Sequence, residues 1–116
     1  MRSYSIQNYI RYKEDVKIKL KRLPDKPYNE YTRDELIIKF LPLVENLARK
    51  FPSGQQASGI MNIMDFIQEG SKGLIRAVDR IDWHTLMSSD DVEKTLKSFL
   101  AKRIRGAIRR GIDANR

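Results

Sequence analysis

The sequence predicts an all-α protein, a compact bundle of about four helices with a basic N-terminal helix or arm. Apolar residues recur at spacings of three and four along most of the chain, which is the period of one helix face. Few stretches have the alternating pattern of a β-strand. The 116 residues suffice for one modest core. We divide them into a basic segment at residues 1–30 and a helical domain at residues 31–116.

The first predicted helix covers about residues 5–22 and has a sparse apolar stripe. The stripe consists of Ile6, Tyr9, Ile10, Val16 and Leu20. Its opposite face is mostly Lys and Arg, and the prolines of LPDKP oppose continuation of the helix. The segment is either a packed helix or a loosely held basic arm, and its periodicity favours the helix.

The second predicted helix begins with Thr32-Arg33-Asp34-Glu35, the Thr-x-x-Glu pattern of a capping box. Its apolar stripe consists of Leu36, Phe40, Leu43, Val44, Leu47 and Phe51. Pro42 falls inside this stripe and removes a backbone donor, so we expect a kink or a restart near residues 38–42. The segment ends at FPSGQQASG, whose composition predicts a polar loop.

The third predicted helix covers about residues 62–81, with Asn62 as its cap and Asp65 near the positive end of its dipole. One face carries Ile63, Phe66, Ile67, Leu74, Ala77, Val78 and Ile81. Gly70 lies on this face and Gly73 at its edge, although a glycine inside a helix costs about 1 kcal/mol relative to alanine. The two glycines therefore predict a second helix that passes too close for a side chain.

The fourth predicted helix starts near Ser88-Ser89-Asp90-Asp91 and runs to about residue 112. Its apolar stripe consists of Val92, Leu96, Phe99, Leu100, Ile104, Ala107 and Ile108. Lys94, Ser98, Lys102, Arg105 and Arg109 line the opposite face, and Arg103 and Arg110 flank the apolar edge. Residues 94–112 contain no acidic residue, whereas a helix that needed only solubility would mix charges to gain ion pairs along it.

The net charge of +8 is unevenly distributed, with +4 in residues 1–30, −3 in residues 31–93 and +7 in residues 94–116. The basic C-terminal part predicts a polyanionic partner, for which nucleic acid is the natural candidate. The acidic middle part suggests a partner of a second kind.

Several classes of protein are excluded or disfavoured by composition. The chain has no cysteine and a single histidine, His84, so we expect neither disulfides nor a metal site. Paired carboxylates, a phosphate-cradling loop and a Ser/His/Asp set are all missing, so we predict no enzyme activity, no catalytic residue and no cofactor. No apolar run approaches the roughly 18 residues of a membrane span, and the first residues do not resemble a signal peptide. We therefore expect a cytoplasmic protein without a membrane partner.

Three motifs, in order FLPLVENLARKF, MDFIQEGSKGLIRAVDRID and AKRIRGAIRRGID, lie within residues 33–113. Together they resemble region 2 of the bacterial sigma factors. Sigma factors bind core RNA polymerase, bring it to promoters and help to melt the −10 element. The resemblance implies a sigma-like transcription initiation factor whose partners are core RNA polymerase and promoter DNA.

In the sigma family, the polar face of the helix that matches residues 63–81 docks on a coiled coil of the polymerase β′ subunit. Carried over by position, this surface consists of Asp65, Gln68, Glu69 and Ser71, with Ile75 at its margin. The same face can also be explained by local ion pairs, Glu69 with Lys72 and Arg76 with Asp79. We prefer docking for Gln68 and Glu69, and local pairing for Lys72, Arg76 and Asp79.

The resemblance and the charge pattern together give a DNA-binding set. It consists of Trp83, Lys97, Phe99, Lys102, Arg103, Arg105, Arg109 and Arg110. Phe99 matches a family tyrosine that stacks on bases, but its place on the apolar stripe also suits a core residue. Lys102 and Arg103 stand where the best-known members have a Trp pair, so we assign phosphate contact to the basic residues. Trp83 lies in an extra stretch, WHTLMSSDDVEKTL, and either supplies a stacking surface or covers the core.

Nothing within these 116 residues matches the later domains of the family, which read the −35 element. A region 2 domain alone resembles the minimal sigma-like factors of some bacteriophages, which implies a separate co-activator or a simplified promoter. Two alternatives stay open. One is a sigma-derived adaptor or antagonist that binds polymerase without melting DNA, and the other is a basic helical protein that binds nucleic acid nonspecifically.

Overall fold

The computed structural model describes residues 2–52, 54–56 and 59–114, and side chains in residues 7–52 and 62–114. Within these residues the helices are α1 (Arg2–Lys21), a 3-10 helix η1 (Tyr28–Glu30), α2 (Arg33–Lys39), α3 (Leu41–Ala48), α4 (Ile63–Val78), α5 (Trp83–Met87) and α6 (Val92–Ala114). Two short strands, β1 (Gly54–Gln56) and β2 (Gly59–Met61), pair in an antiparallel hairpin. The predicted all-α class is confirmed. No helix in the described residues is long and apolar enough to cross a membrane.

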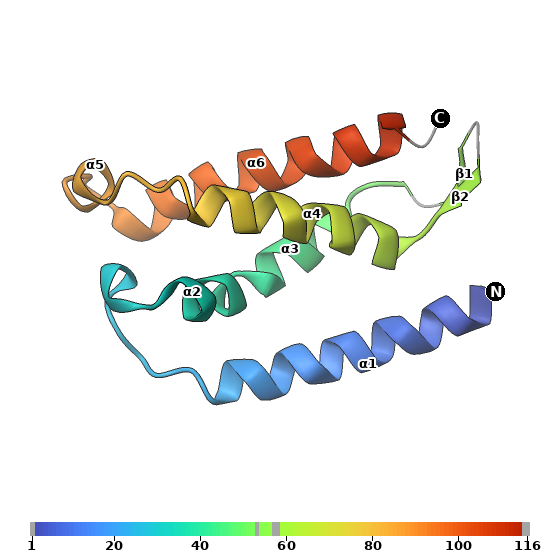
Figure 1. Cartoon of the computed structure of the whole chain (residues 1–116), viewed down its shortest axis with the longest axis horizontal. Coiled ribbons are helices and arrows are strands. Elements are labelled where there is room, and N and C mark those ends of the chain that lie inside the picture. The colour runs from blue at the N-terminus through green and yellow to red at the C-terminus, as the bar shows by residue number, and fades with distance from the viewer. Residues whose placement is uncertain (1, 53, 57–58, 115–116) are drawn as a thin grey trace.

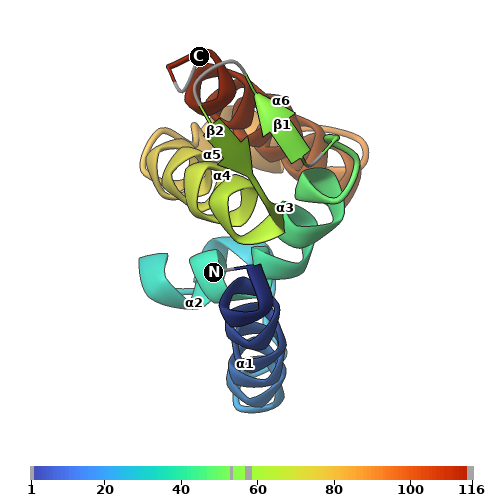
Figure 2. The same ribbon diagram turned by 90° about the vertical axis from the view of Figure 1, so that its right-hand side faces the viewer.

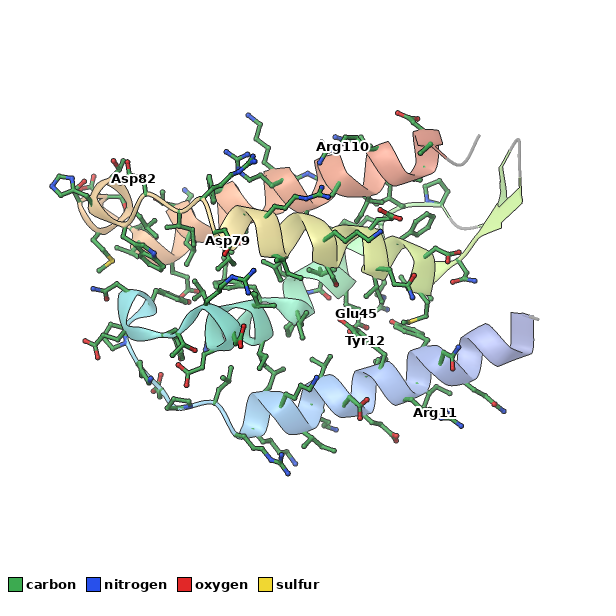
Figure 3. The ribbon with its side chains drawn as sticks, viewed as in Figure 1. Arg11, Tyr12, Glu45, Asp79, Asp82 and Arg110 are labelled. Atoms are coloured by element: carbon green, nitrogen blue, oxygen red, sulfur yellow. The ribbon has the colours of Figure 1, made fainter. Side chains whose placement is uncertain are left out.

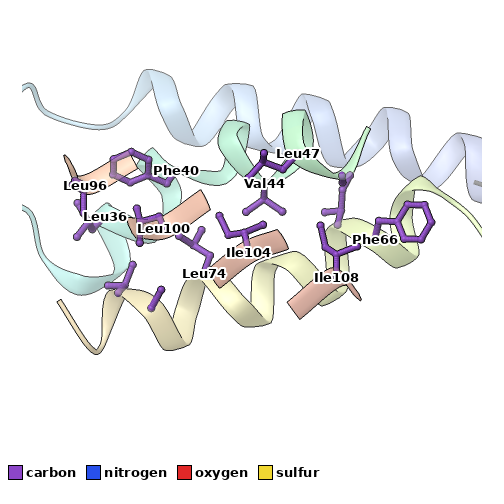
Figure 4. Close-up of a cluster of buried hydrophobic side chains, with 14 of the residues drawn as sticks. Leu36, Phe40, Val44, Leu47, Phe66, Leu74, Leu96, Leu100, Ile104 and Ile108 are labelled. Atoms are coloured by element: carbon purple, nitrogen blue, oxygen red, sulfur yellow. The ribbon is translucent and has the colours of Figure 1, made fainter. Parts of the chain in front are cut away.

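The helices surround one core, and α4 and α6 are its main pair. The two helices run antiparallel side by side, with α2 and α3 packed across them (Figure 1). In the end-on view, α1 projects away from the other helices (Figure 2). The largest fully buried side chains come from α2, α3, α4 and α6 and meet between these elements (Figure 4). They are Leu36, Val44, Phe66, Ile67, Leu74, Leu96, Leu100, Ile104 and Ile108.

Both predicted capping signals are present as reciprocal hydrogen bonds. The Thr32 hydroxyl accepts from the Glu35 amide at 3.2 Å, and the Glu35 carboxylate accepts from the Thr32 amide at 2.9 Å. Asn62 accepts from the Asp65 amide at 3.3 Å, and the Asp65 carboxylate accepts from the Asn62 amide at 2.9 Å. Each box satisfies amides that the first turn leaves without a helical partner, so α2 and α4 start at defined residues.

The restart predicted at Pro42 occurs at Phe40, which separates α2 from α3. Phe40 has φ −105° and ψ 9°, outside the helical range, and α3 begins at Leu41. Pro42 then lies in the first turn of α3, where a missing amide hydrogen breaks no helical bond. The break turns the apolar faces of two short helices onto the same core, in which Leu36, Phe40 and Val44 are buried.

The close approach predicted from the glycines of α4 is confirmed. A Cβ atom at Gly73 would lie 2.6 Å from the Ala107 Cβ and 3.0 Å from the Arg103 carbonyl oxygen. At Gly70 a Cβ atom would lie 3.0 Å from the Val44 Cγ1 and 3.2 Å from the Ile104 Cγ2. At Gly73 the neighbouring atoms belong to the backbone and a Cβ of α6, which cannot rotate away. The interaxial distance between α4 and α6 is therefore set at Gly73.

Three boundaries differ from the sequence prediction. The stretch expected to be a polar loop contains the β1–β2 hairpin, in which Gln55 pairs with Ile60. Helix α4 ends at Val78 rather than near residue 81. The extra stretch forms a short helix of its own, α5, because Asp82 accepts hydrogen bonds from the Thr85 amide at 3.2 Å and the Thr85 hydroxyl at 2.9 Å.

Helix α1 forms as the periodicity favoured, but only part of its apolar stripe is buried. Val16 is 8% exposed, whereas Ile10 is 52% exposed. The side chain of Ile6 lies outside the described residues. The Tyr9 hydroxyl donates to the Glu45 carboxylate at 2.6 Å, and burial together with this bond raises the pKa of Tyr9 to about 12. Burying a valine contributes about 2 kcal/mol and a hydrogen bond to a charged group a similar amount, so α1 is held by few interactions.

The glycine contact predicts a difference between two matched substitutions. Gly73→Ala and Gly106→Ala both gain about 1 kcal/mol of helix propensity. Gly73→Ala must also push α6 outward, and such overpacking costs about 1–3 kcal/mol. At Gly106 an added Cβ would meet only the flexible end of Arg110, at 3.3 Å. We expect urea denaturation to show Gly73→Ala less stable than Gly106→Ala by this overpacking cost, and equal stabilities would refute the close contact.

Candidate functional site

A basic groove runs between α4 and α6, with a volume of about 550 Å³. Its lining consists of Gly73, Arg76, Ala77, Arg80, Phe99, Lys102, Arg103, Gly106, Arg109 and Arg110. Six of these residues are Lys or Arg and none is acidic, so the groove holds a concentrated positive field. We call it the α4–α6 groove.

The small residues of the interface explain why the groove has this form. Gly73 and Ala77 on α4 and Gly106 on α6 carry little or no side chain, so the floor of the groove is close to backbone. Arg76 lies in the last turn of α4 and Arg80 in the turn that follows the helix, and both line the same wall. The remaining cations stand on α6 opposite them. A polyanion that enters the groove would therefore meet positive charge from both helices.

The sequence predicted a local ion pair between Arg76 and Asp79, but Asp79 does not pair with Arg76. Its carboxylate binds Arg33 at the start of α2 through two hydrogen bonds, Nε–Oδ1 at 2.5 Å and Nη2–Oδ2 at 3.0 Å. These bonds lower the pKa of Asp79. The other expected local pair is present, with Lys72 and Glu69 3.6 Å apart. Because Asp79 binds Arg33 of α2, its negative charge does not neutralise Arg76, which lines the groove.

One end of the groove opens into a smaller apolar cavity of about 260 Å³ beside Phe99. The cavity is lined by Arg80, Ile81, Asp82, Thr85, Leu86, Thr95, Leu96 and Phe99. Arg80 and Phe99 belong to both spaces. The guanidinium of Arg103 lies over the Phe99 ring, 4.4 Å from the ring centre, so it covers one face of the ring and is itself the group available for stacking. Aromatic rings and guanidinium planes are the groups on which unpaired bases stack.

The structure brings together five of the eight residues that the sequence assigned to DNA. Phe99, Lys102, Arg103, Arg109 and Arg110 line the α4–α6 groove. The other three, Trp83, Lys97 and Arg105, do not line it.

The three residues outside the groove have other surroundings, and Phe99 has two. Trp83 is half-buried and packs against the core from α5. Lys97 is paired with Glu93 at 2.8 Å, and Arg105 is half-buried. Phe99 packs against the core, as its place on the apolar stripe predicted, and it also lines the groove.

Arg76 and Arg80 line the groove but were not predicted from the sequence to do so. Arg76 lies on the flank of α4 that carries Gly73 and Ala77 and faces α6, and Arg80 follows in the turn after the helix. Their spacing from the glycine, by three and seven residues, was the available signal. It was obscured because Asp79 stands three residues after Arg76 and looked like its partner.

The five residues assigned to polymerase docking are spread over three sides of α4. Gln68 is exposed, and Ile75 is one of four large apolar side chains exposed in the described residues, at 37%. Seven residues separate them, so they share an outward ridge of the helix. Asp65 lies at the helix start and is engaged in the capping box with Asn62.

Glu69 and Ser71 lie on opposite flanks of this ridge. Glu69 packs onto α6, because a Cβ at Gly111 would lie 2.5 Å from the Glu69 Cγ. Ser71 is half-buried and faces Tyr12 of α1. Figure 3 shows Tyr12 directed into the space between α1 and the rest of the molecule. The directly accessible part of the docking set is therefore Gln68 and Ile75.

Comparison with protein-family models, with curated proteins and with solved structures finds no match to this chain. The resemblance to sigma factors thus rests on the three motifs of the sequence. In the described residues there is no group of three or more His, Asp or Glu side chains placed to hold a metal ion.

The groove predicts how binding of a single-stranded oligonucleotide depends on salt. Each phosphate contact contributes about 0.7 to the slope of log affinity against log salt concentration, because a counterion is released. We expect Arg80→Gln and Arg109→Gln each to weaken binding and to reduce this slope by about that amount. Lys50→Gln, an exposed position at the end of α3 outside the groove, serves as the control. Equal slopes for all three variants would show that the strand does not follow the groove.

Proposed function

We propose that this protein is a sigma-like transcription initiation factor that binds core RNA polymerase and directs it to −10-type promoter DNA. The observation that carries the proposal is the division of α4 into two usable faces. One face forms the outward ridge of Gln68 and Ile75, and the other forms a wall of the basic α4–α6 groove. A single rigid helix would thus link a protein-docking surface to a nucleic-acid path.

The groove supports binding of a single strand in particular. Its cations suit phosphates, and the Arg103 guanidinium, which lies over the Phe99 ring beside an apolar cavity, offers a group on which a base can stack. Stacking of a base on such a surface contributes about 1–3 kcal/mol and does not require a particular base. This arrangement would stabilise an opened strand of a promoter, which is how a factor of this class helps to separate the duplex.

The ridge supports docking on a protein. It presents the exposed Ile75 beside the uncharged Gln68, and its assignment to docking rests on the motif that this helix carries. The partner that the motifs imply is the coiled coil of the β′ subunit. A separate co-activator would read the −35 element, and the protein would act in the bacterial cytoplasm as a cellular or a phage factor.

A second candidate function is that of an adaptor or antagonist that binds polymerase without opening DNA. The observation in its favour is that Lys102 and Arg103 replace aromatic residues and that Trp83 packs against the core instead of lining the groove. Only Phe99 then offers an aromatic stacking surface in the groove. Nonspecific binding of nucleic acid would use the groove but not the ridge.

Docking can be tested with one charge change at two exposed positions. Gln68→Arg places a cation on the ridge of α4, whereas Asn46→Arg makes the same change on α3. We expect Gln68→Arg to lower co-purification with core RNA polymerase at least tenfold, since burying an unpaired charge costs more than 1.4 kcal/mol. Asn46→Arg should bind as the unmodified protein does. Circular dichroism verifies that both variants keep their helices, and equal binding by both would remove the ridge from the proposal.

Promoter opening is tested by run-off transcription with purified core polymerase. We expect discrete starts that depend on the protein and on a −10-like sequence, and loss of these starts with Phe99→Ala while polymerase binding is retained. Core binding without any change in starts would favour the adaptor or antagonist. DNA binding with a steep salt dependence and no affinity for polymerase would leave only the nonspecific function.

A further inference from the structure

Helix α1 covers the flank of α4 that carries Ser71. The Tyr12 ring packs against the core, and its hydroxyl faces Ser71. Burial raises the pKa of Tyr12, and the charge of Glu45 raises it further. Figure 3 shows Tyr12 and Glu45 directed toward one another, while Arg11 lies on the other side of α1. A protein that contacts Ser71 must therefore approach a site that α1 occupies.

The packing of α1 is weak compared with that of the other long helices. Val16 is the buried apolar side chain within residues 7–21, and it does not belong to the core cluster. Ile10 and Ile18 are about half exposed, at 52% and 50%. The Tyr12 hydroxyl is buried beside Ser71 but forms no hydrogen bond of good geometry with it. A buried hydroxyl that forms only a poor hydrogen bond adds little to the stability of the α1 contact.

The polar contacts of α1 converge on a single acceptor, Glu45 of α3. Tyr9 donates to Glu45 at 2.6 Å, and the Lys13 ammonium lies 3.8 Å from the same oxygen. Arg49 also lies 3.9 Å from it, from α3 itself. If α1 moved away, Glu45 would keep its ion pair with Arg49 and would accept hydrogen bonds from water. Release of α1 would thus leave no buried carboxylate without a partner.

The chain beyond α1 is fixed to the body. The Tyr31 hydroxyl donates to the Pro24 carbonyl at 2.9 Å, and the Lys26 ammonium lies 3.1 Å from the Glu35 carboxylate. Tyr31 itself is buried in the core cluster. Movement of α1 would therefore pivot at Arg22 and Leu23, between the end of the helix and this anchored segment.

From these contacts we infer that α1 is a displaceable lid over the Ser71 flank of α4, and that full docking on polymerase requires it to swing away. The inference rests on the proposed function, because Ser71 belongs to the docking surface that the motifs imply. In the closed state the protein presents only Gln68 and Ile75. The fraction of open molecules then limits the apparent affinity for polymerase.

Three substitutions in the full chain test the lid. Val16→Asp places a charge in the interface and opens it, whereas Ile18→Asp makes the same change at an exposed position of the same helix. Tyr12→Phe removes this poorly bonded hydroxyl and closes the lid further. Hydrogen exchange of the α1 amides measures opening, and fluorescence titration with core RNA polymerase measures affinity.

We expect Val16→Asp to speed exchange throughout α1 and to raise polymerase affinity about tenfold, as for a competent state populated in about one molecule in ten. Tyr12→Phe should slow exchange and lower affinity about threefold, and Ile18→Asp should change neither. Core helices α4 and α6 should keep their protection in all variants.

Other outcomes separate the lid from the proposed function. Faster exchange with lower affinity in Val16→Asp would show that α1 is part of the docking surface, and faster exchange with unchanged affinity would show that it does not limit access; either result overturns the lid. Binding by Val16→Asp alone, with no binding by the unmodified protein, would support a lid that is almost always closed. No binding by any of the four proteins would refute the proposed function, and the lid with it.

Discussion

The contact between Gly73 of α4 and Ala107 of α6 is the constraint on which the rest of the structure depends. Neither residue has a side chain that can move aside, so the backbones set the spacing. That spacing lets Leu74, Ile104 and Leu100 interdigitate in a dry core, since buried side chains pack at the density of organic crystals. It also leaves a shallow floor on the outside, over which the cations of both helices face each other. The same close approach of α4 and α6 therefore produces both the core and the groove.

The groove is unusual in how its charge is arranged. Six cations line it, and the nearest acidic residue along α4, Asp79, binds Arg33 of α2. Surface helices commonly place opposite charges one turn apart, which gains a few tenths of a kcal/mol per pair. One wall of the groove has no such ion pair. Elsewhere the pairs are present, between Glu69 and Lys72 and between Glu93 and Lys97. The anionic partner that we propose would account for this difference.

Local signals in the sequence predicted most of the helices, because the interactions concerned are themselves local. The caps at Thr32 and Asn62 and the break at Phe40 follow from residues within one turn. The glycines of α4 indicated a close helix but not which helix it is. The hairpin at β1–β2 and the short helix α5 were missed, since a three-residue strand and a five-residue helix carry too few residues for a periodic signal. The candidate site was harder to predict from the sequence. The pairing of Asp79 with Arg33, 46 residues away, is decided by tertiary structure, and with it the place of Arg76 in the groove.

The anchor formed by Tyr31 and Pro24 determines what happens to α1 after it leaves the body. A helix joined through two residues to a fixed point cannot diffuse away, so its effective concentration at α4 stays on the order of millimolar. Competition between this helix and an incoming protein is then intramolecular, and its balance does not change when the cell makes more of the chain. After the partner dissociates, α1 returns to α4 in a unimolecular step. Each molecule is therefore closed again before it meets the next partner.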